Sequence, residues 1–133
     1  MADHDNHRER LLALMEAVLG AYAFIQAVLE DLPIPVTIPD FEPGDGDDEG
    51  GPRSALLSLA RVRAIIPDEP ITERYQRAYD RLILDWFTTY ELLVLTQAAG
   101  PAPWRLDAAE FSLNRVVTWI ELIEEGELDD DES

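Results

Sequence analysis

The two histidines and the carboxylates around them are the first candidates for chemistry in this sequence. His4 and His7 are three residues apart, so they share one face of a helix, and imidazole nitrogens bind transition metals. Acids flank them at Asp3, Asp5 and Glu9. The set lies at the polar start of the chain, where side chains are commonly mobile. We therefore interpret it as a polar N-terminus and predict no metal site.

No combination of residues typical of an enzyme follows. The chain has no cysteine and no histidine after His7, which excludes thiolate metal sites, Glu-x-x-His di-iron sites and serine nucleophiles with a histidine base. Asp80, Asp85 and Glu91 are spaced like acids on a solvated helix face. The sequence predicts a protein that is not an enzyme and has no cofactor.

The segment from Asp45 to Gly50 resembles the first half of an EF-hand calcium loop, with acids at alternate positions. The twelfth position of such a loop is Leu56, where the motif requires a bidentate glutamate, and Pro52 lies inside the twelve residues 45–56. We reject the calcium motif on these grounds.

Acidic residues dominate the composition. The chain holds 28 acids against 10 basic residues, all of them arginine, and its net charge is -18. Six acids lie in residues 40–49 and eight in residues 121–132. Such a charge indicates either a proteome adapted to molar salt or an anionic surface for a cationic partner. The use of arginine without lysine is typical of a GC-rich or salt-adapted genome. The candidate partner-binding acids are Asp45, Asp47, Asp48, Glu49, Asp129, Asp130 and Asp131.

Half of the arginines gather around one predicted turn. They could bind phosphates or an acidic peptide, and they are Arg61, Arg63, Arg74, Arg77 and Arg81. The same stretch contains four acids, at Asp68, Glu69, Glu73 and Asp80. Residues 61–81 therefore carry only +1, five arginines against four acids, and we favour a charge-balanced surface.

The run from Leu11 to Leu32 is apolar around most of a helix. It has the length of a membrane span or a signal anchor, but Glu16 and Gln26 would then lie in hydrocarbon, where a charge is costly. We predict a helix that several neighbours bury, and no membrane. A row of small residues would let another backbone approach closely, at Ala13, Ala17 and Ala21.

Periodicity and breakers predict helices over residues of about 5–32, 54–66, 70–98 and 108–125. Ser54 is the expected cap of the second helix, Pro70 fits the first turn of the third, and Asp107 with Glu110 forms a capping-box pattern for the fourth. The second helix should turn an apolar set inward, comprising Leu56, Leu57, Leu59, Ala60, Val62, Ile65 and Ile66.

Residues 33–53 form a long connection with five prolines, and residues 126–133 form an acidic tail. Val36 and Ile38 are expected to lie against the helices. The sum is a single all-α domain, an antiparallel four-helix bundle with one long, Pro-rich acidic linker.

The leading functional hypothesis is a cytoplasmic interaction or assembly subunit that binds a protein, as a homo-oligomer or in a larger complex. Its basis is the amount of apolar helix surface, which four helices do not obviously bury. One alternative is an acidic mimic of nucleic acid that inhibits a DNA- or RNA-binding protein. Another is a small subunit of a nucleic-acid complex that uses the Arg61–Arg81 cluster. Direct nucleic-acid reading is disfavoured because residues 111–120 contain only one basic side chain, Arg115.

Overall fold

A computed structural model describes residues 2–41, 52–100 and 102–126 of the chain. Within these residues it contains four α-helices, one short 3₁₀ helix and no β-strand, which confirms the all-α prediction. The elements are α1 (Ala2–Glu30), α2 (Pro52–Ile65), η1 (Ile66–Asp68), α3 (Glu73–Ala99) and α4 (Pro103–Glu125).

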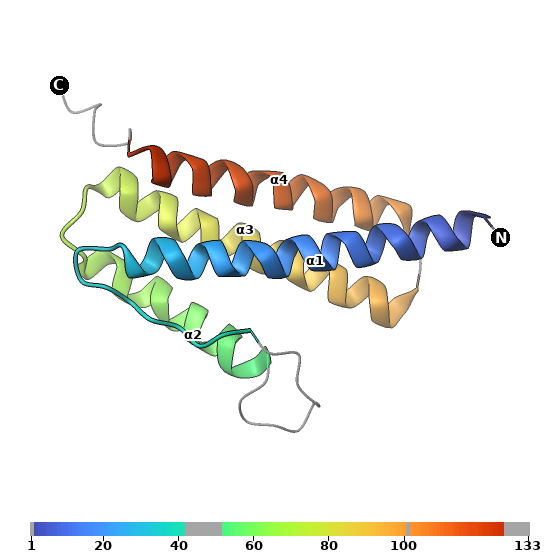
Figure 1. The fold of residues 1–133 in the computed structure, drawn as a ribbon, viewed down its shortest axis with the longest axis horizontal. Helices are drawn as coiled ribbons and strands as arrows, with labels where there is room; N and C mark the ends of the chain where they lie inside the picture. The colour runs from blue at the N-terminus through green and yellow to red at the C-terminus, as the bar shows by residue number, and fades with distance from the viewer. Residues whose placement is uncertain (1, 42–51, 101, 127–133) are drawn as a thin grey trace.

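The three long helices, α1, α3 and α4, lie side by side, and α3 runs in the direction opposite to the other two (Figure 1). The most extensive packing is between α3 and α4, and α1 contacts both. The shorter α2 packs against η1 and α3. It therefore covers only part of the length of the long helices (Figure 1).

Two of the predicted helix starts are wrong, for local reasons. The third helix begins at Glu73 rather than residue 70, because the Thr72 side chain caps it by accepting the Tyr75 backbone N–H at 3.3 Å. The fourth begins at Pro103 rather than residue 108, since a proline needs no hydrogen-bond acceptor in the first turn of a helix. Asp107 consequently lies inside α4 and does not cap it.

The other boundaries differ by a few residues. Helix α2 begins at Pro52, so Ser54 is a helical residue and not its cap. Helix α1 ends at Glu30 rather than residue 32, where the Leu32 N–H turns back to the Leu29 carbonyl. Gly126 follows α4 with a φ of 71°, a left-handed conformation that glycine adopts without strain.

Residues 33–41 fold back along α1 and form a strap. The Val36 N–H donates to the Leu29 carbonyl at 3.1 Å, and the Tyr22 hydroxyl donates to the Pro39 carbonyl at 2.6 Å. Ile38 is buried and Val36 half-buried, as predicted. At its end Phe41 packs edge-on against the ring of Tyr22, with 5.5 Å between centroids.

The core centres on Trp86, which is fully buried where α1, α3 and the strap meet. Its ring stacks on Tyr90 with 5.2 Å between centroids. Helix α2 contributes Leu59 and Val62 to this core. Three residues of its predicted inward set are instead exposed, namely Leu57, Ala60 and Ile65.

Candidate interaction surface

Helix α1 has one face in the core and one in solvent. The inner face carries Val18, Tyr22, Ile25 and Leu29, all of which are buried. The outer face is formed by small or apolar residues that the four helices leave exposed, namely Leu12, Ala13, Ala17, Gly20, Ala23, Phe24 and Ala27. Glu16 is the only charged residue between Leu12 and Ala27. The prediction that several neighbours surround α1 is therefore wrong for this face.

A groove of about 290 Å³ runs beside this outer face, between α1 and α4. Small residues of α1 line it together with Phe24 and Val117, which have 57% and 44% of their surface exposed. We call this surface the α1–α4 face and define it by Ala13, Ala17, Gly20, Ala21, Phe24, Val117, Ile120 and Glu121. It joins a recess and a protruding aromatic ring in one apolar area.

Hydrogen bonds on the inner side fix the rotation of α1. The Trp86 indole N–H donates to the Val18 carbonyl at 2.8 Å, and the Tyr79 hydroxyl donates to the Val28 carbonyl at 3.2 Å. Both donors come from α3 and both bonds are buried. Because they hold α1 at two points, its outer face is directed to solvent.

Burial also raises the pKa of two tyrosines at the inner face of α1. It raises the pKa of Tyr22 to about 12, with a smaller contribution from the Asp40 carboxylate. Burial likewise raises the pKa of Tyr79 to about 12, and the charge of Asp31 adds to it. Both hydroxyls therefore remain protonated donors through the physiological pH range.

An ion-pair cluster lies at one end of the α1–α4 contact. The Arg10 guanidinium contacts Asp107 at 2.8 Å and Glu110 at 2.7 Å. These are the two residues predicted to form the capping box, and they instead connect α4 to α1. A second pair joins α3 and α4, where Asp85 accepts from Arg115 at 3.1 Å and from the Trp119 indole at 2.9 Å.

The five candidate arginines are divided between two helices. Arg61 and Arg63 lie on α2, and Arg63 contacts Asp80 at 2.7 Å. The other three lie on α3 and are exposed: Arg74, Arg77 and Arg81. Arg77 and Arg81 share one open depression with Glu73 and Asp80. This mixture of signs favours the interpretation of a charge-balanced surface.

The candidate acids Asp45, Asp47, Asp48 and Glu49, and Asp129, Asp130 and Asp131, lie outside the described residues. His4 and His7 lie within the first turns of α1, and His7 is half-buried. Among the described residues no group of three potential ligands could hold a metal ion.

Sequence reasoning missed several contacts that depend on tertiary packing. The spacing of Asp85 predicts a solvated acid, yet its carboxylate accepts hydrogen bonds from two side chains of α4. Glu69 is buried, and its carboxylate accepts the Ile34 N–H at 3.1 Å, which ties the strap to the turn before α3. No local pattern marks either role, because the partners are about 30 or more residues away in sequence.

In the part of the chain that is described, one helix segment, Asn6–Glu30, is long and apolar enough to cross a membrane by length and composition. Comparison of the chain with protein-family models, with curated proteins and with solved structures finds no match.

Proposed function

We propose that this protein is a non-enzymatic assembly subunit, an antiparallel four-helix bundle that binds a second copy of itself through the α1–α4 face. The observation that carries the proposal is the exposed apolar outer side of α1, with one charge between Leu12 and Ala27. Contiguous apolar surface of this kind is typical of protein interaction sites.

A second copy is the occupant that the shape favours. Two-fold symmetric contacts require one surface to be complementary to itself. We expect the α1–α4 face to meet this requirement, because it combines a groove lined by Gly20 with the exposed ring of Phe24. In an antiparallel crossing of two α1 helices, Phe24 of each copy can enter the groove of the other. The small residues Ala13 and Ala17 then allow close approach of the helices.

The size of the face fits a small, weakly associating dimer. The apolar outer side of α1 runs from Leu12 to Ala27, 16 residues or about 24 Å, and two packed helices are about 20 Å wide. Their product is about 480 Å², below the roughly 800 Å² that each partner contributes to a standard interface and in the range of weak, reversible complexes. Gly20 lies near the middle of this stretch, where interface contacts contribute most.

Charge should make this association dependent on salt. Each copy carries -18, so two copies repel each other in dilute buffer. Molar salt reduces the screening length to about 3 Å and removes most of this repulsion without weakening apolar contact. We therefore expect a dimer that is tighter in molar KCl than at low salt.

The test is the native mass by light scattering at low salt and in molar KCl, for the natural chain and two variants. Phe24→Glu places a charge in the proposed interface and should give a monomer. Leu95→Glu is the matched control, since it adds the same charge at an exposed leucine of α3, outside the groove, and should remain a dimer.

A natural chain that stays monomeric in molar KCl at about 100 μM would overturn the proposal, because even a micromolar dimer would then be populated. So would a Phe24→Glu variant that dimerises as tightly as the natural chain. Flotation with neutral phospholipid vesicles separates one further outcome. A monomer that floats with vesicles would assign the outer side of α1 to a membrane instead.

A further inference from the structure

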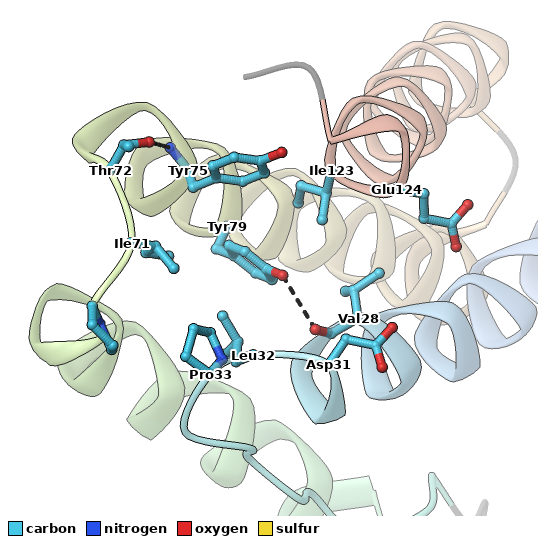
Figure 2. A pocket seen from close by; sticks show the side chains of 11 residues that line it. Val28, Asp31, Leu32, Pro33, Ile71, Thr72, Tyr75, Tyr79, Ile123 and Glu124 are labelled. Atoms are coloured by element: carbon cyan, nitrogen blue, oxygen red, sulfur yellow. Dashed lines mark hydrogen bonds between the residues drawn. The ribbon is translucent and has the colours of Figure 1, made fainter. Parts of the chain in front are cut away.

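A second hollow is lined by residues at the ends of α1 and α4 and the start of α3 (Figure 2). These helix ends lie together at one end of the molecule (Figure 1). The volume of the hollow is about 690 Å³, within the range of roughly 300–1,000 Å³ that small-ligand sites occupy. None of the residues that form the α1–α4 face lines it. It is therefore a separate site, and its chemistry can be considered independently of the proposed dimer.

Aromatic and aliphatic side chains form the walls of this cavity. Tyr75 and Tyr79 project from the first turns of α3, and Leu32, Ile71 and Ile123 complete the apolar lining (Figure 2). The Tyr79 ring is held by its hydrogen bond to the Val28 carbonyl. The wall is thus fixed before any ligand arrives, which lowers the entropic cost of binding.

The rim of the same cavity is negative. Asp31 and Glu124 both line it and are exposed, and no basic side chain belongs to the lining (Figure 2). Both α1 and α4 end here, and neither has a basic residue in its last turn. The partial negative charge of two helix C-termini therefore adds to that of the two carboxylates.

We propose that this cavity binds an organic cation, an ammonium or guanidinium group carried on an aliphatic stem. The stem packs against the leucine and isoleucine side chains, and the cation lies between Asp31 and Glu124. The faces of the tyrosine rings also attract a cation. A bare metal ion would leave the apolar wall unused, and a neutral ligand would leave the two carboxylates unpaired. The same chemistry is offered by a free alkylamine and by a lysine or arginine side chain of a partner.

The experiment is a titration followed by the amide NMR spectrum of the full chain, with n-butylammonium as the probe. Binding should shift the amide signals of residues around the cavity, such as Ile71 and Tyr75, with a millimolar dissociation constant. Butanol has the same stem without the charge and should bind at least about tenfold more weakly. 1,4-Diaminobutane and a lysine blocked at both ends then distinguish a free amine from a partner's side chain as the better ligand.

A pair of double variants separates the site from the general negative charge of the protein. Asp31→Asn with Glu124→Gln removes the two rim carboxylates and should weaken n-butylammonium binding about tenfold, since two partly exposed ion pairs are lost. Glu30→Gln with Glu125→Gln makes the same charge change one residue away on each helix, at exposed positions outside the cavity. This control should weaken binding less than twofold.

Equal loss of affinity in the two double variants would overturn the proposal, because general electrostatics would then explain the binding. Butanol binding as tightly as n-butylammonium would overturn it as well. So would the absence of any shift near the cavity up to about 50 mM probe, given that even a 10 mM dissociation constant would saturate most sites.

Discussion

The inner and outer faces of α1 are both apolar, yet they contribute differently to the molecule. The inner face carries large side chains such as Tyr22 and Ile25, which are buried. The outer face consists mainly of alanine and glycine around Phe24, and it remains exposed. Large apolar side chains gain about 1.5–3 kcal/mol each on burial, whereas alanine and glycine gain little. Side-chain size, more than hydropathy, separates the face that holds the fold together from the face available to a partner.

The largest difference is expected between two neighbouring residues of α1. Ile25→Ala removes a fully buried side chain and should lower the free energy of unfolding by about 2–5 kcal/mol. Phe24→Ala removes a larger but half-exposed side chain and should change the monomer by less than about 0.5 kcal/mol. Urea denaturation at protein concentrations that keep the chain monomeric measures both. Similar losses for the two variants would show that the outer face also stabilises the monomer.

Alkaline pH should reduce the stability that the buried tyrosines of the inner side contribute to the fold. The pKa of both Tyr22 and Tyr79 is about 12 in the fold against about 10 in the unfolded chain. The unfolded chain therefore loses these protons first as the pH rises, and the stability contributed below pH 10 is lost between about pH 10 and 12. At pH 11 each tyrosine should lower the free energy of unfolding by at most about 1.4 kcal/mol.

Urea denaturation at pH 9 and pH 11 measures this loss, with ultraviolet absorbance to follow tyrosinate formation. Tyr79→Phe serves as the control, because it lacks one of the buried tyrosine ionisations and should show a shallower decline. A variant that declines as steeply as the natural chain would assign the alkaline effect to other groups.

Gly20→Ala should stabilise the monomer and weaken the proposed dimer. A Cβ added at Gly20 would meet nothing within 4 Å beyond the adjoining backbone of its own helix, and alanine is favoured over glycine inside helices by about 0.5–1 kcal/mol. The monomer should therefore become more stable by that amount. In the proposed dimer the same methyl group occupies the groove and should weaken association. Thermal unfolding measures the stability and light scattering the association of the same sample. A variant that is more stable and still dimerises as tightly as the natural chain would place the partner on another surface.

The smallest effect is expected at the Arg10 ion pairs, at one end of the α1–α4 contact. Arg10 contacts Asp107 and Glu110 with its side chain more than one third exposed. Surface ion pairs of this kind contribute less than about 1 kcal/mol and are screened by salt. Arg10→Ala should therefore lower the free energy of unfolding by about 0.5 kcal/mol in dilute buffer and by almost nothing in molar KCl. A loss that persists in KCl would indicate that the arginine stem contributes by packing.

Helix type and approximate position could be predicted from the sequence because prolines and glycines act locally. Gly126 ends α4 and Pro33 follows the end of α1 for reasons that neighbouring residues contain. The capping-box pattern at Asp107 misled because the same two acids serve equally well as partners for Arg10, a distant residue. A local motif cannot indicate which of these two uses prevails.

The candidate sites were less accessible to prediction than the helices. The row at Ala13, Ala17 and Ala21 predicts a place where another backbone could approach closely, but it does not indicate that Ala13 and Ala17 face solvent while Ala21 is buried. The cavity at the end of the molecule joins Asp31, which follows α1, with Tyr75 of α3 and Glu124 of α4. Such a juxtaposition depends on how α1, α3 and α4 align along their lengths, and periodicity does not specify this alignment.

The strap has a consequence for the order in which the chain folds. Its bonds to α1 join residues fewer than 20 positions apart, such as Tyr22 and Pro39, so α1 and the strap can form one local unit early. Helices α3 and α4 are adjacent in sequence and form a second unit with the most extensive packing. The two units meet where the Trp86 ring contacts the rings of Tyr22 and Phe41. We therefore expect burial of this indole to mark the late, long-range step of folding, and the fluorescence of a variant with Trp104 and Trp119 replaced by Phe would follow it.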